Sequence, residues 1–197
     1  STRGWSYGAS VIDPRTGEII KGQVSLGSLR VRQDYMILSG LIDNPNKIEN
    51  MNLIKETSLD RIRQLSAHEI GHTLGFAHNY ISSASNRSSV MDYPHPKIDI
   101  VNGEINIDQA YSKDIGEWDK VSVKYAYTDF SDSVDEEIEL NKIIEKASNK
   151  GIHFLREYDS RTGGRDNTLS HYWKNRELLN QDRDEQCKER RKALNKN

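Results

Sequence analysis

Three histidines and one glutamate lie close together in the stretch HEIGHTLGFAH, residues 68–78. Residues four apart lie one turn apart on the same face of an α-helix, so His68 and His72 can bind one metal ion at about 2.0–2.1 Å without distorting the backbone. Gly75 can adopt a positive φ angle, end the helix and turn the chain back toward the ion. His78 then becomes the third ligand, and the spacing predicts a Zn²⁺ site.

Glu69 follows the first ligand directly, so its carboxylate can lie beside the metal and take a proton from a water that the metal activates. Three neutral nitrogen ligands leave a coordination position open for that water, whereas a closed structural site more often uses cysteines. This predicts a hydrolytic site with Glu69 as the general base. The alternative, that His68 and His72 are ordinary helix residues, weakens once Gly75 and His78 are counted.

The amino-acid composition excludes some classes of partner and of chemistry. The 197 residues carry a formal net charge of -2, which gives no field of one sign to attract nucleic acid. No apolar run approaches the ~18 residues of a membrane span. Cys187 is the single cysteine, so an internal disulfide is impossible and a Cys nucleophile in its charged surroundings is disfavoured. We therefore expect no nucleic acid and no membrane span, whereas the protein or peptide partner that we expect follows from the hydrolytic site and not from composition.

The segments before the motif predict strands and then helices. Residues 5–27 are typical of a hairpin around the turn DPRTG, and residues 28–42 have apolar residues at helical spacing. A polar loop is expected over 44–52. Thr57 or Ser58 is then expected to cap the helix that carries the motif.

The segments after the motif are predicted to be mainly helical. Residues 79–96 should be irregular, and Asn102-Gly103 predicts a hairpin over 98–107. Helices are expected over 112–127 and over 133–150, the second with a capping-box-like start at Ser133 and a stop at Gly151. Two regions follow from this pattern, a catalytic domain over 1–160 and a polar, charge-rich C-terminal extension over 161–197.

The extended histidine motif resembles that of the metzincin clan of metallopeptidases, whose members have a methionine-containing turn after the third histidine. The resemblance places Met91 beneath the imidazoles as a hydrophobic floor. It also places Tyr93 where some branches have a tyrosine that stabilises the oxyanion, with simple packing as the alternative. His95 either lines the specificity pocket or is solvated.

More of the chain is similar to the Met-zincin domain of large bacterial zinc-dependent metalloproteases, through WSYGASVIDPRTGE (5–18), GSLRVRQ (27–33) and GEWDK (116–120). The similarity covers roughly residues 4–160. It implies that an edge strand, for which Glu18–Leu26 is the best candidate, binds extended substrate. It also implies an extracytoplasmic location, further sheet elements upstream and the remainder of a larger polypeptide.

The expected fold is therefore α/β (α+β) and metzincin-like, with a twisted sheet, incomplete at the N-terminus, over the zinc-binding helix and a mainly helical C-terminal part. The expected function is a zinc-dependent endopeptidase with Glu69 and Tyr93 as catalytic residues. A non-catalytic zinc-containing binding module of a larger surface protein is the alternative. A zinc hydrolase acting on a non-peptide amide would share the same site.

Overall fold

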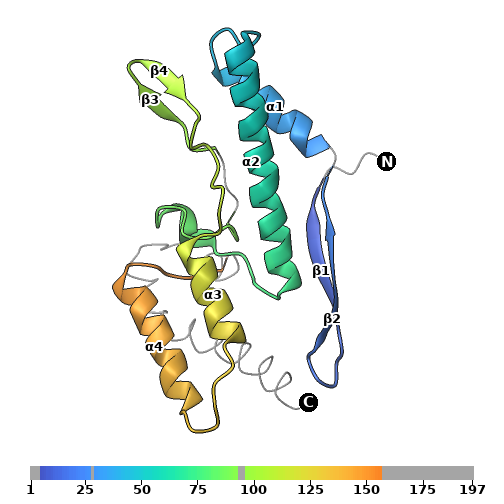
Figure 1. Ribbon diagram of the computed structural model, residues 1–197, viewed down its shortest axis with the longest axis vertical. Coiled ribbons are helices and arrows are strands. Elements are labelled where there is room, and N and C mark those ends of the chain that lie inside the picture. Colours follow the sequence, from blue (N-terminus) through green and yellow to red (C-terminus); the bar gives the residue numbers. More distant parts are fainter. Residues whose placement is uncertain (1–4, 28, 93–95, 157–197) are drawn as a thin grey trace, which may run out of the picture.

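The computed structural model describes residues 5–27, 29–92 and 96–156, which form a mixed α+β fold (Figure 1). No helix in these ranges is long and apolar enough to cross a membrane. The elements in chain order are β1 (Tyr7–Ile12), β2 (Ile19–Ser25), α1 (Leu29–Leu41), α2 (Ile48–Thr73), the 3₁₀ helix η1 (Tyr80–Ser83), β3 (Asp99–Val101), β4 (Glu104–Asn106), α3 (Glu117–Tyr127) and α4 (Glu136–Asn149).

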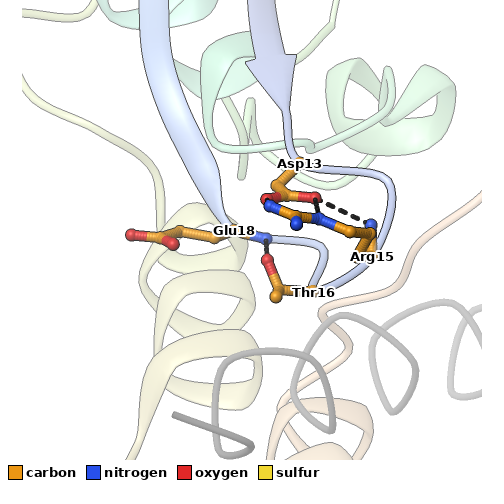
Figure 2. A network of polar contacts seen from close by, with 4 residues as sticks. All are labelled: Asp13, Arg15, Thr16 and Glu18. Carbon is orange, nitrogen blue, oxygen red and sulfur yellow. Dashed lines mark hydrogen bonds and ion pairs between the residues drawn. The ribbon is translucent and has the colours of Figure 1, made fainter.

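The first two strands form the predicted antiparallel hairpin, with Tyr7 opposite Ser25 at its open end. Its turn is held by local polar contacts (Figure 2). The Asp13 carboxylate accepts hydrogen bonds from the backbone and the guanidinium of Arg15, at 2.7–3.1 Å. The Thr16 hydroxyl accepts one from the amide of Glu18, and Gly17 has the positive φ of 75° that lets the chain turn back. The turn chemistry read from the sequence is therefore present.

The hairpin runs alongside the C-terminal half of α2 (Figure 1). Gly8 allows this approach, because a Cβ there would lie 2.0 Å from the carbonyl oxygen of Glu69. A Cβ at Gly22 would lie 3.0 Å from the side chain of Thr73, and the Ser10 hydroxyl donates to the Thr73 carbonyl. The predicted sheet over the motif-bearing helix is thus confirmed as a two-stranded hairpin in the described part of the chain.

The central helix α2 begins earlier than predicted. Residues 48–52, which were expected to be loop, are helical, and Thr57 and Ser58 lie inside the helix rather than at its cap. The Ser58 hydroxyl donates to the carbonyl of Ile54 one turn back, at 2.7 Å. Ile54 itself is fully buried against Leu38 of α1, and this packing favours helix where the local sequence predicts a loop.

The remaining elements follow α2 in the predicted order, with shifted starts. The hairpin β3–β4 turns at Asn102 and Gly103, both with positive φ. Helix α3 begins at Glu117, five residues later than predicted, because Gly116 caps it. Helix α4 is capped by Asp135, whose carboxylate accepts from two backbone amides, and not by Ser133. It ends before Gly151, which has the expected positive φ.

Candidate metal centre

The three predicted ligands converge at the end of α2. The Nε2 atom of His72 lies 3.1 Å from that of His68 and 3.0 Å from that of His78, and the third pair is 3.2 Å apart. Nitrogens at ~2.0–2.1 Å from one tetrahedral ion lie about 3.3–3.4 Å from each other. The three nitrogens therefore lie close to, and slightly inside, the separation that a shared ion requires, and the three side chains form a group able to hold a metal.

Two of the imidazoles are fixed by backbone acceptors. The Nδ1 atom of His68 lies 2.6 Å from the carbonyl oxygen of Val90, and that of His72 lies 2.9 Å from the carbonyl oxygen of Phe76. A carbonyl only accepts, so each Nδ1 carries the hydrogen and each Nε2 presents its lone pair to the common centre. Lone pairs that face one another repel in the absence of a cation, so this donor set fits a bound metal.

The third ligand reaches the site because α2 ends in a Schellman motif. Gly75 has a φ of 86°, its amide donates to the carbonyl of His72 at 3.0 Å, and the amide of Phe76 donates to the carbonyl of Gly71 at 3.0 Å. Only glycine adopts this conformation without strain. The role expected for Gly75, ending the helix so that His78 folds back, is the geometry observed.

Glu69 is 4% exposed and lies where α2 meets β1. Burial raises the pKa of its carboxyl above the usual value, whereas electrostatic interaction with His72, a hydrogen bond with the backbone of Gly8 and electrostatic interaction with Arg61 act to lower it. Burial also disfavours the charged form of His68, and lowers the pKa of its imidazole to about 4. The imidazole is therefore neutral and able to bind metal at neutral pH.

Met91 packs against α2 at Gly71, which lies between His68 and His72 in the helix. Its sulfur lies where a side chain at Gly71 would be, since a Cβ built there is 2.3 Å from Sδ. Met91 is 3% exposed. Its carbonyl accepts from the amide of Asn79, the residue after His78, at 2.8 Å. The methionine thus connects the ligand-bearing helix to the chain that carries the third ligand.

An apolar cavity of about 720 Å³ opens beside His72 at the end of α2. It lies between the turn end of the β1–β2 hairpin, the end of α2 and one face of α3. His72 and Met91 form part of its wall, and Trp118 and Tyr125 line it from α3. Its size suits a bulky apolar group.

Sequence reasoning did not identify several residues that shape this centre. The carbonyls of Val90 and Phe76 carry no signal in side-chain type, so no pattern points to them. Gly71 could have been noticed as a small residue within the motif, and Gly8 as a glycine within a strand, where close backbone approach is a common cause. Tyr93, His95 and the 161–197 extension lie outside the described residues.

Three convergent histidines on a helix and the loop after it, beside a buried glutamate, define a site of the metzincin class. The sequence model of the Met-zincin family matches residues 50–196, most of the chain. The chain therefore belongs to the Met-zincin family of the metzincin clan, as its motif predicted. No curated protein and no solved structure matches it.

Proposed function

We propose that this chain is a zinc-dependent endopeptidase domain. The observation that carries the proposal is the convergence of the three imidazole Nε2 atoms, 3.0–3.2 Å apart, with the buried Glu69 directly after the first ligand in the helix. The family supports zinc as the metal, and the neutral nitrogen donor set suits it. A purely structural site would have no use for a buried carboxylate next to its first ligand.

Zinc held by His68, His72 and His78 would polarise a substrate carbonyl and lower the pKa of a water molecule. Glu69 accepts a proton from the attacking water and delivers it to the amine nitrogen of the leaving group. The burial that raises its pKa brings the carboxyl closer to the working pH of such a shuttle. Met91 would keep the helix and the third ligand in register as a Met-turn. Tyr93 would donate a hydrogen bond to the oxyanion.

The strand that would pair with substrate is β1 and not β2. The sequence favoured the segment Glu18–Leu26, yet β1 is the strand that contacts α2 at Glu69 and His72, through Gly8. β2 contacts α2 at Thr73, beyond the second ligand. The outer edges of both strands pair with no other strand in the described ranges, so the contact at Glu69 and His72 is what favours β1. An extended peptide added along this edge would gain main-chain hydrogen bonds close to the general base.

Digestion of casein or a peptide library by the full-length protein tests the proposal. Chelator should abolish cleavage, and Glu69→Gln should lower kcat/KM by about 10²–10⁴-fold while zinc remains bound. The matched control is Glu56→Gln, an exposed glutamate on the same helix, which should cleave like the wild type. If Glu69→Gln binds one equivalent of zinc and cleaves as well as the wild type, the peptidase assignment fails and the non-catalytic binding module gains support.

A further inference from the structure

Asp119, near the start of α3, is a buried carboxylate with three donors and, among the described residues, no cation paired with it. It is 6% exposed. Its Oδ1 accepts from the Ser89 hydroxyl at 2.5 Å, and its Oδ2 accepts from the amides of Val90 at 2.8 Å and Gly116 at 2.7 Å. Both oxygens are therefore occupied, and two of the three donors belong to the segment just before Met91.

Val90 connects this carboxylate to a metal ligand. Its amide donates to Asp119, and its carbonyl accepts from Nδ1 of His68 at 2.6 Å. The two groups belong to the peptide bonds on either side of one residue. A displacement of the Val90 backbone therefore moves the acceptor that sets the tautomer and ring orientation of His68.

We propose that Asp119 is a positioning residue for the metal site, which holds the Val90 backbone so that its carbonyl orients His68. The inference rests on the three-histidine zinc site of the proposed function, but it does not depend on catalysis. An outer partner that orients a ligating histidine typically affects metal affinity 10–100-fold.

The packing around Asp119 supports this role. A Cβ at Gly116 would lie 2.1 Å from the carbonyl oxygen of Ser88, so the start of α3 meets the 88–90 backbone directly. The amide of Trp118 donates to that same carbonyl at 2.8 Å. The Ser89 hydroxyl, besides donating to Asp119, accepts from the amide of Met91 at 3.0 Å. The start of α3 thus fixes the segment that carries both the His68 acceptor and the methionine.

A simple helix cap would explain only part of this arrangement. Capping α3 requires Asp119 to accept from Gly116, one turn earlier, and nothing more. The bonds to Ser89 and Val90 serve no capping purpose. Only an acceptor can satisfy all three donors, so an asparagine would turn its NH₂ group toward at least one of them. Asp119→Asn is therefore an almost isosteric change that disturbs either the Ser89 contact or the Val90 and Gly116 contacts, and so loosens the hold of Asp119 on the 89–90 segment.

The test measures zinc affinity by chelator competition on the full-length folded protein. Asp119→Asn should bind Zn²⁺ 10–100-fold more weakly than the wild type. Ser89→Ala should weaken binding by about fivefold, the equivalent of one hydrogen bond. The control is Asp135→Asn at the cap of α4, where the carboxylate accepts only from the amides of Glu137 and Ile138 among the described residues, and it should bind zinc like the wild type.

A second readout separates positioning from general stability. The NMR resonance of the His68 Nδ1–H in the zinc-loaded protein should shift in Asp119→Asn and in Ser89→Ala, but not in Asp135→Asn. If Asp119→Asn does not fold, Ser89→Ala decides alone. Wild-type affinity and an unmoved resonance in the folded variants would overturn the inference while leaving the zinc site intact. A wild-type protein that binds no zinc would instead contradict the proposed function.

Discussion

The candidate site has two halves that are held in different ways. The helical half consists of His68, Glu69 and His72, which lie together because one regular helix passes through all three. The loop half consists of His78 and Met91, which come from irregular chain; the amide of Asn79, next to His78, donates to the Met91 carbonyl, and the carbonyl of Val90, next to Met91, accepts from His68. One half therefore depends on local periodicity and the other on long-range contacts. Among substitutions that leave the three histidines unchanged, those in the loop half should therefore disturb the site most.

Removing the Met91 side chain is the most damaging such change. Met91→Ala leaves a cavity against Gly71, so the free energy of unfolding of the zinc-free protein should fall by roughly 2–5 kcal/mol in urea titrations. Met91→Leu, which conserves volume, should cost less than about 1.5 kcal/mol. Equal losses for the two variants would mean that the thioether and not its volume matters. No loss for either would show that the loop half does not need this contact.

The second prediction concerns His68, a member of the helical half that is buried against the loop half. Burial lowers its pKa from 6.5 to about 4. The unfolded chain therefore takes up a proton as the pH falls through about 6.5, while the folded protein stays neutral until about pH 4. Stability from this residue is complete above pH 6.5 and should fall by about 3 kcal/mol toward pH 4.

Urea unfolding of the metal-free protein between about pH 7 and pH 4 measures this loss, with His68→Gln as the comparison because a neutral amide does not titrate. The wild type should lose about 3 kcal/mol more than the variant over this range. Parallel pH profiles for the two proteins would show that His68 is not buried by the loop in solution, and would weaken the distinction between the two halves.

The helical half could be predicted from the sequence because every constraint in it is local. A spacing of four residues places His68 and His72 on one face in any helix, and a glycine three residues later indicates where the helix ends. The same local reasoning misplaced the start of α2. Thr57 and Ser58 are good capping residues, but burial of Ile54 against α1 extends the helix past them.

The loop half was only partly predictable. Family resemblance pointed to Met91. The segment just before it, residues 89–90, is fixed by hydrogen bonds to Asp119, which lies 29 or 30 positions away in sequence. The start of α3 was misplaced for the same reason. Gly116 caps the helix, and its backbone packs on that of Ser88. No local pattern in the sequence indicates this contact. Partners of this kind become apparent only when the chain is folded.

The smallest expected effects compare two glycines, one at the junction of the halves and one remote from both. Gly75 has a φ of 86°, so Gly75→Ala places a Cβ in a left-handed conformation and should cost about 1–2 kcal/mol of stability. Because this turn carries His78 to the site, the same variant should also bind zinc more weakly. Gly40 lies within α1, and a Cβ there would contact nothing within 4 Å, so Gly40→Ala should stabilise the protein by about 0.5–1 kcal/mol. Thermal unfolding and zinc titration of both variants measure these effects. A stability loss and weaker zinc binding in Gly75→Ala, together with a stability gain and unchanged zinc binding in Gly40→Ala, would show that the two halves meet at the Gly75 turn. Equal changes in stability and in zinc affinity for the two variants would mean that Gly75 does not have that role.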